Sequence, residues 1–147
     1  MRELRFSVPG KPSTNHRPRF IGLRRGKPRF KPADDFAAFK ERVQMCATNA
    51  RPRDWPMHAI GPRGGKLVML YAVSVVGCAS GMDYDADNLR GVLDACEGIL
   101  WPNDVRCAPA SYDRETGHRD LGVDVTVIAW DPREGRMRTR FQWEGET

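Results

Sequence analysis

The chain has 147 residues, of which 40% are hydrophobic, and its formal net charge at pH 7 is +5. This length predicts one domain with a core of its own, and no apolar run is long enough to span a membrane. The N-terminus carries no apolar signal segment, so we expect an intracellular, cytoplasmic protein with no membrane partner.

The first elements expected along the chain are a strand, a basic hairpin and a helix. Apolar and polar residues alternate over residues 3–8, which predicts a strand, and a turn-rich segment follows it. A basic hairpin is expected within residues 17–31, with 19–23 against 27–30 and the turn near Arg25 and Gly26. A helix should run from Asp34 or Asp35 to about Asn49. Its buried face would comprise Phe36, Phe39, Val43, Cys46 and Ala47.

The second half of the chain predicts a sheet with one more helix. Residues 51–65 read as a loop, and 66–77 are apolar on both faces, as in a central strand. A helix is expected over 88–100, where apolar residues recur at helical spacing. Strands should follow at 105–112, with Pro109 at an edge or bulge, and at 121–130. The resulting fold class is α+β, with a small mixed or antiparallel sheet of four to five strands and two helices on one face. One domain would span 1–130, followed by a polar, disordered tail at 131–147.

The charges are distributed unevenly along this chain. Residues 1–31 hold ten Lys and Arg residues against one acid, whereas residues 83–104 hold six acids against one base. A basic arm attracts a polyphosphate backbone, and a cation held among acids offsets their repulsion of phosphate. This contrast is typical of a metal-dependent enzyme that acts on a polyphosphate. The alternative for the arm is a solvated loop with no partner.

The acidic stretch contains Asp83, Asp85, Asp87 and Asn88 in G-M-D-Y-D-A-D-N-L-R, and then Asp104 in L-W-P-N-D-V. A short return after the helix between them would bring Asp104 back towards the first aspartates. Carboxylates that lie together repel one another unless a positive charge sits among them. The usual solution is a hard divalent cation, Mg²⁺ or Mn²⁺, bound by oxygen atoms.

Two other interpretations fit the acidic stretch less well. A calcium-binding EF-hand loop would need Gly where Asn88 stands and a bidentate Glu where Asp94 stands, and its flank here is strand-like. A helix-capping loop explains Asp87 as an N-cap. It explains neither Asp104 nor the acidic Asp94, which is seven residues from Asp87 and on the same helical face.

The pattern D85-A-D87-N88-L, a helix with Asp94-Ala95, and then W101-P-N-D104-V resembles the RusA family of Holliday junction resolvases, which are often borne by phages or prophages. The opening, a strand ending V8-P9-G-K-P12-S13-T-N15 and followed by R17-P-R19 and a basic hairpin, is similar too. The resemblance covers roughly residues 4–129. It implies that Asp85, Asp87 and Asp104 are catalytic carboxylates that bind the metal, with Asn88 and Asp94 supporting the site.

Two residues depart from the family pattern. Gly91 stands where the family has a lysine, and a one-residue deletion would put Arg90 in the place of that lysine. Arginine can clamp a phosphate but cannot give up a proton. The family's pair of aspartates is Asn103-Asp104 here, so one carboxylate is missing, and Asp104 would be the retained ligand.

The resemblance implies Mg²⁺-dependent hydrolysis of phosphodiesters in four-way DNA junctions, with Mn²⁺ as a substitute. Two matched nicks require two sites, which a homodimer supplies, and Arg90 would neutralise the transition state. Phosphate contacts are expected from Lys11, Asn15, Arg17, Arg19, Arg24, Arg25, Lys27 and Arg29. The alternatives are a non-catalytic nucleic-acid-binding module with a degenerate acidic site, or a nuclease that acts on flaps or forks.

Overall fold

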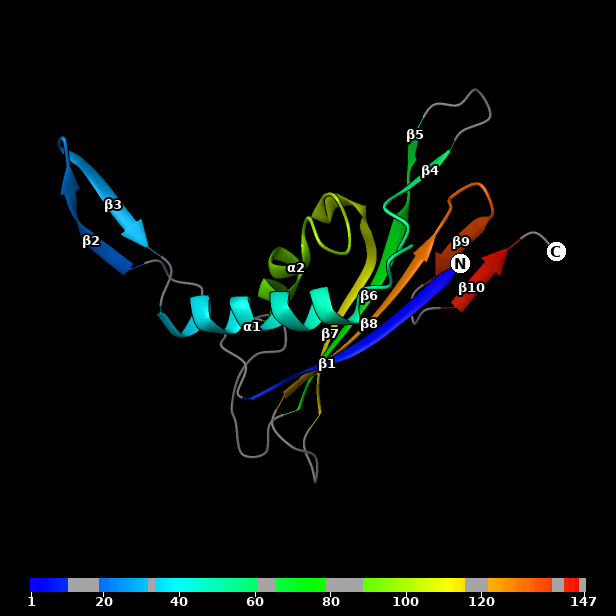
Figure 1. Ribbon diagram of the computed structural model, residues 1–147, viewed down its shortest axis with the longest axis horizontal. Coiled ribbons are helices and arrows are strands. Elements are labelled where there is room, and N and C mark those ends of the chain that lie inside the picture. The colour runs from blue at the N-terminus through cyan, green and yellow to red at the C-terminus, as the bar shows by residue number, and fades with distance from the viewer. Residues whose placement is uncertain are drawn as a thin grey trace.

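A computed structural model describes residues 1–10, 19–31, 34–60, 66–78, 89–115, 122–138 and 142–145. Its centre is a four-stranded mixed sheet in the order β1-β8-β6-β7 (Figure 1). The neighbours β1/β8 and β8/β6 are antiparallel, and β6/β7 is parallel. The strands are β1 (Arg2–Pro9), β6 (Leu70–Cys78), β7 (Cys107–Glu115) and β8 (Gly122–Trp130). The α+β class expected from the sequence is confirmed.

Alternation along the two central strands separates the faces of this sheet. Val73 of β6 pairs with Val127 of β8, and Val75 pairs with Val125, and all four side chains are buried. The residues between them, such as Ser74 and its partner, are only half-buried. Because successive side chains of a strand point to opposite faces, the valines form one continuous apolar face.

Helices α1 (Asp34–Ala50) and α2 (Gly91–Cys96) pack on that apolar face. The α1 residues Phe39, Val43 and Ala47 are buried at spacings of four, so they lie along one stripe of the helix. The whole expected stripe is apolar, and its other two members, Phe36 and Cys46, are half-buried. The two helices therefore cover one face, as expected, and α2 lies between α1 and the sheet edge formed by β7 (Figure 1).

Three two-stranded hairpins accompany the central sheet. The first confirms the expected basic hairpin and pairs β2 (Arg19–Arg24) with β3 (Lys27–Lys31). The second pairs β4 (His58–Ile60) with β5 (Lys66–Val68), so part of the expected loop 51–65 is a strand instead. The third pairs β9 (Gly135–Arg138) with β10 (Gln142–Gly145).

The third hairpin differs from the disordered tail expected after residue 130. Met137 is buried and packs with Ala72 and Trp130 in a small cluster separate from the main core. These residues belong to the sheet face that the helices leave uncovered. The segment carries too few apolar residues to show a periodicity, and Met137 packs it against the sheet.

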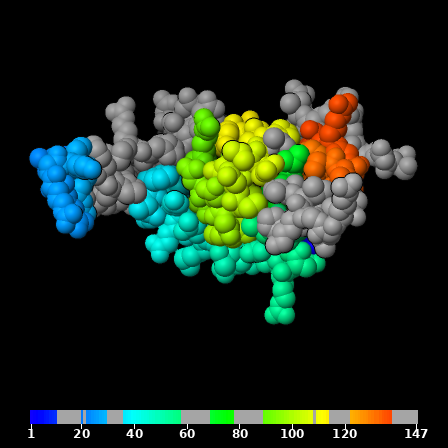
Figure 2. All heavy atoms as spheres, turned by 90° about the horizontal axis from the view of Figure 1, so that it is seen from above, coloured from blue at the N-terminus to red at the C-terminus, as the bar shows by residue number. Residues whose placement is uncertain are grey.

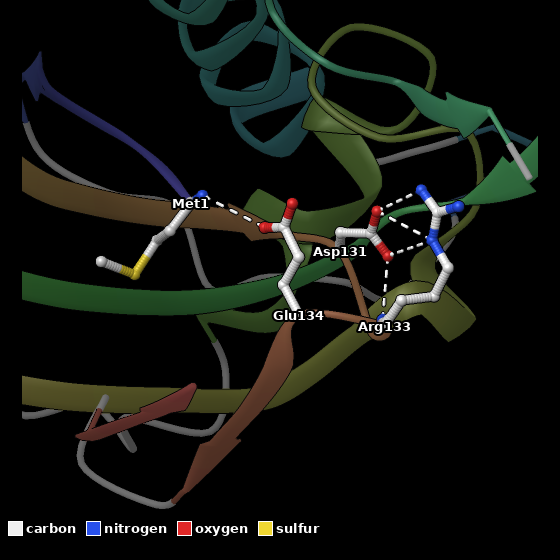
Figure 3. Close-up of polar contacts among 4 residues, drawn as sticks. All are labelled: Met1, Asp131, Arg133 and Glu134. Atoms are coloured by element: carbon white, nitrogen blue, oxygen red, sulfur yellow. Dashed lines mark hydrogen bonds and ion pairs between the residues drawn. The ribbon is translucent and has the colours of Figure 1, made fainter. Parts of the chain in front are cut away.

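The turn that joins β8 to β9 is fixed by Asp131, which is buried (Figure 3). Its Oδ1 accepts hydrogen bonds from the backbone N–H of Arg133 at 2.9 Å and from the Arg133 guanidinium at 3.0 Å. These hydrogen bonds hold the pKa of Asp131 below its ordinary value. The neighbouring Glu134 lies 3.9 Å from the amino group of Met1, so the turn also contacts the start of β1.

The helix expected over 88–100 is much shorter in the structure, because α2 ends at Cys96. Glu97 leaves the helical conformation with φ −60° and ψ 132°, and Gly98 adopts φ +83°, which favours glycine. The N–H of Gly98 then donates to the carbonyl of Trp101 at 2.7 Å. Leu100, expected on the helix, lies in this turn. Within the described ranges, no helix is long and apolar enough to cross a membrane.

Candidate active site

A cavity of about 700 Å³ lies between α2 and the beginning of β7. We call it the acidic cavity. It brings together three of the site residues expected from the sequence: Arg90, Asp94 and Asp104. The described residues that line it are Arg90, Leu93, Asp94, Asp104, Val105, Cys107, Ala110 and Tyr112.

Asp104 is held in the cavity by the turn that follows α2. Trp101 is fully buried, with its ring 6.0 Å from that of Tyr71, and its indole N–H donates to Asp104 Oδ1 at 2.7 Å. Trp55, also buried, donates to the carbonyl of Leu100 at 2.8 Å and fixes the same turn from the other side. The carboxylate of Asp104 therefore has a set orientation, because the core holds the residues around it.

Asn103 has a structural role beside this carboxylate. Its side-chain oxygen accepts from the backbone N–H of Val105 at 3.1 Å, which caps the one-turn 3-10 helix Asp104–Arg106. Asn103 is thus the N-cap of the turn that carries Asp104. The departure from the family's pair of aspartates leaves one carboxylate and one cap at these two positions.

Asp94 and Asp104 form a close pair of carboxyl groups. Burial raises the pKa of Asp104, and the hydrogen bond and negative charge of Asp94 raise it further. The hydrogen bond from Trp101 and the positive charge of Lys40 on α1 act in the opposite direction. A carboxyl group in the position of Asp104 is costly to ionise, and a cation beside it would reduce that cost.

Arg90 and Tyr112 lie together in the same cavity. Burial raises the pKa of the half-buried Tyr112, and the positive charge of Arg90 acts in the opposite direction. Tyr112 also lies within electrostatic range of Asp104. The cavity therefore combines two carboxyl groups, an arginine and a tyrosine.

Two free thiols lie near the cavity, Cys96 and Cys107. Burial raises the pKa of Cys96 to about 12 and that of Cys107 still higher, so without a metal both are protonated at neutral pH. The carboxyl oxygens of Asp94 and Asp104 are the donors in the cavity lining that Mg²⁺ and Mn²⁺ prefer.

The remaining residues of the expected site are placed as follows. Asp83, Asp85, Asp87 and Asn88 lie outside the described residues, as do Lys11, Asn15 and Arg17. In the described part of the chain, no three His, Cys, Asp or Glu side chains come close enough to hold a metal. Arg24, Arg25, Lys27 and Arg29 are exposed on the β2–β3 hairpin, and Arg19 begins that hairpin.

Sequence reasoning missed Lys40, Trp101 and Tyr112. Lys40 is half-buried on α1 beside the buried stripe, and nothing in its spacing separates it from a solvated lysine. Trp101 carried a usable signal, because a tryptophan three residues before a carboxylate can reach it with its N–H. Tyr112 enters the cavity only because β7 pairs in parallel with β6.

Comparison with known proteins leaves the family of this chain open, since no family model and no curated protein matches its sequence.

Proposed function

We propose that the chain is a metal-dependent endodeoxyribonuclease that resolves four-way DNA junctions as a homodimer, in recombination and repair. The observation that carries this proposal is the Asp94–Asp104 carboxyl pair beside Arg90 in one cavity. Phosphodiester hydrolysis needs a cation site and a positive group for the phosphate in one place. The resemblance of the sequence to the RusA family supports the choice of branched DNA as substrate.

The two carboxyl groups described in the acidic cavity, Asp94 and Asp104, are oxygen donors of the kind that a hard divalent cation binds. Asp104 would hold the cation together with Asp85 and Asp87, which come shortly before α2 in the sequence, with Asp94 in support. The raised pKa of Asp104 is consistent with this assignment, because a cation would offset both the burial and the neighbouring negative charge that raise it. When bound, the cation would activate water and stabilise negative charge on the phosphoryl oxygens.

The other residues of the cavity act on the DNA phosphate. The Arg90 guanidinium would bind a non-bridging phosphate oxygen and neutralise the charge that develops during cleavage. Tyr112 lines the cavity beside that guanidinium. Trp101 would fix the orientation of Asp104. The carboxylate of Asp104 would thus be oriented before the substrate arrives, which favours electrostatic catalysis.

A binding module without catalysis is the second candidate. It is favoured by Asn103, which caps a turn where the family has a carboxylate, and by Gly91 in the place of the family lysine. In that case the carboxyl pair would be structural and the basic hairpin would bind nucleic acid without cleaving it. A nuclease acting on flaps or forks would use the same chemistry with a different DNA shape.

The test is incubation of the full chain with a labelled four-way junction and with a linear duplex of matched sequence. Each substrate is tested with Mg²⁺, with Mn²⁺ and with a chelator, and the Asp104→Asn variant is the control for a contaminating nuclease. We expect the wild type to make paired nicks in the junction when Mg²⁺ or Mn²⁺ is present. We expect no nicks with the chelator or with Asp104→Asn. Binding to the junction without cleavage under every metal condition would support the binding module. Cleavage of flaps or forks in preference to junctions would identify those structures as the substrate instead.

A further inference from the structure

The β2–β3 hairpin stands apart from the body of the protein. Its two strands pair with each other and join no other strand. In both views it lies at one end of the molecule, beyond the beginning of α1 and far from the central sheet (Figures 1 and 2). A two-stranded hairpin is at best marginally stable alone in water, so one with this placement is expected to gain from a partner.

The pairing register makes this hairpin amphipathic. Arg24 pairs with Lys27 and Leu23 pairs with Pro28, and the register shifts between Phe20 and Gly22. Without that bulge, Phe20 and Leu23 would lie on opposite faces, because they are three residues apart. With it, Phe20 and Leu23 share one face, together with Pro28.

The opposite face of the hairpin is basic. It carries Arg24, Lys27 and Arg29. Arg24 of β2 pairs with Lys27 of β3, and Arg29 lies two residues after Lys27 in β3, so all three side chains point to the same face. All three are exposed, and within the described part of the chain none of them forms an ion pair. The apolar face is equally accessible, with Phe20 56% and Leu23 69% exposed.

The turn at the tip of the hairpin adds another positive charge. Arg25 has φ +52° and Gly26 has φ +75°, so the two-residue turn needs left-handed backbone at both positions. Asn, Asp or Gly would satisfy that conformation at Arg25 with less strain. The chain has a cation there instead, at the point that projects furthest along the hairpin.

We infer that the hairpin is inserted at the branch point of the DNA, with its apolar face against an exposed base pair and its basic face against phosphates. This inference rests on the proposed function. A linear duplex shows its base-pair faces only at its ends, whereas a junction can expose them where its arms meet. Aromatic and apolar side chains stack on exposed bases of any sequence, and lysine and arginine bind the adjacent backbone.

Charge favours DNA over a second copy of this chain as the partner of the hairpin. Residues 19–31 contain no acid, and the chain as a whole carries a net charge of +5. A second copy therefore presents the same excess of positive charge, whereas DNA presents a phosphate along each strand at every step. The hairpin thus distinguishes branched from linear DNA, and the acidic cavity carries out the chemistry.

The experiment measures binding in the presence of a chelator, so that its result does not depend on cleavage. The variant Phe20→Ser/Leu23→Ser removes the apolar side chains and keeps every charge of the hairpin. Affinity for a four-way junction and for a linear duplex of equal length is measured at several salt concentrations. Met45→Ser is the matched control, because Met45 is 61% exposed on α1, away from the hairpin. Phe20→Trp tests rescue by another aromatic side chain.

We expect the double variant to lose about 10-fold in junction affinity, as for the loss of one stacked base, with unchanged duplex affinity and salt dependence. Met45→Ser and Phe20→Trp should bind like the wild type. Unchanged junction affinity in the double variant, or an equal loss for junction and duplex, would overturn the inference. A change from dimer to monomer in light scattering would also overturn it, because the apolar face would then belong to the subunit interface. Selective junction binding by a wild type that never cleaves DNA would leave the inference standing and refute the proposed nuclease.

Discussion

The acidic cavity and the basic hairpin differ in how the fold supports them. The cavity is built on the core, since Trp101 and Tyr71 are fully buried and Asp104 accepts a hydrogen bond from Trp101. The hairpin has exposed side chains on both faces, and among the described strands its two strands pair only with each other. One region therefore contains a carboxylate oriented by the core, whereas the other offers charge and apolar surface on an exposed ribbon.

Under the proposed function, this difference predicts that the cavity and the hairpin have separate roles. Chemistry on a phosphodiester demands groups held to within fractions of an ångström, which a packed core supplies. Binding to a branched substrate demands reach and adaptable contacts, which a projecting hairpin supplies. Substitutions in the cavity should therefore change cleavage with little effect on binding, and substitutions in the hairpin should do the reverse.

The largest effect is expected from loss of a carboxylate. Asp104→Asn keeps the oxygen that accepts from Trp101 but removes the charge, and we expect junction cleavage to fall more than about 100-fold, beyond the loss typical of groups that only orient a ligand. Asp85→Asn and Asp87→Asn should behave alike. Junction binding, measured by gel shift in a chelator, should be equal or tighter because less negative charge faces the DNA. If Asp104→Asn cleaved at the wild-type rate, Asp104 would not be the metal ligand, and Asp94 would be the next candidate.

A smaller effect is expected at the arginine and tyrosine of the cavity. Arg90→Ala should lose about 100-fold in the rate of the chemical step, whereas Arg90→Lys should retain a good part of it, because a lysine still carries the charge. Tyr112→Phe removes only the hydroxyl and should cost about 10-fold or less. Single-turnover rates at saturating protein separate these losses from binding. Full activity in Arg90→Ala would exclude Arg90 as the substitute for the family lysine.

In the hairpin, removal of three charges should change binding and its dependence on salt. Each phosphate contact contributes about −0.9 to the slope of log K against log salt. The variant Arg24→Ala/Arg25→Ala/Lys27→Ala should therefore flatten that slope by about two to three per protomer if all three touch phosphate. Fluorescence anisotropy at several salt concentrations gives the slope. An unchanged slope would place the DNA elsewhere, with Arg51 and Arg53 after α1 as the next candidates.

The smallest effect concerns the stability of the metal-free protein. Because the folded-state pKa of Asp104 is raised, its charged form destabilises the fold above that pKa, and this penalty disappears as the pH falls through it. Asp94→Asn removes the neighbouring charge, so it should raise Tm at pH 7 by up to about 2–4 °C and should raise it less at pH 4. Thermal unfolding in a chelator at both pH values measures this. A lower Tm at pH 7 would show that the carboxyl pair stabilises the fold.

The pKa of Asp131 is shifted in the opposite direction to that of Asp104. Its pKa is lowered by Arg133, so its contribution to stability is present above its unfolded pKa and is lost as the pH falls through the folded value. Arg133→Ala should therefore lower Tm at pH 7, and this loss should shrink in acid. An equal loss at both pH values would assign the effect to packing instead of charge.

Much of the fold followed from periodicity in the sequence. The strand at Arg2–Pro9, the helix at Asp34–Ala50 and the hairpin turn at Arg25 and Gly26 were expected, because each has a local signal of spacing, capping or turn chemistry. The end of α2 was not expected at Cys96. The apolar spacing in the sequence continues through Leu100, whereas in the structure Gly98 stops the helix. The β9 strand was missed because a lone buried apolar residue such as Met137 makes no periodic pattern.

The candidate site was only partly predictable. Arg90, Asp94 and Asp104 were chosen from the sequence, and the structure places all three on one cavity. Tyr112 and Lys40 reach the same region through sheet pairing and helix packing, which depend on contacts far apart in the chain. The amphipathic character of the hairpin was also hidden, because a bulge between Phe20 and Gly22 decides which side chains share a face.

The division between cavity and hairpin is tested most directly by single-turnover cleavage of one labelled junction at saturating protein with Mg²⁺. Wild type, Asp104→Asn and Arg24→Ala/Arg25→Ala/Lys27→Ala are compared in the same assay. We predict a wild-type rate constant for the hairpin variant, once its weaker binding is overcome by concentration, and no measurable cleavage by Asp104→Asn. Cleavage by Asp104→Asn at the wild-type rate, or a hairpin variant that stays inactive although it is fully bound, would contradict the account.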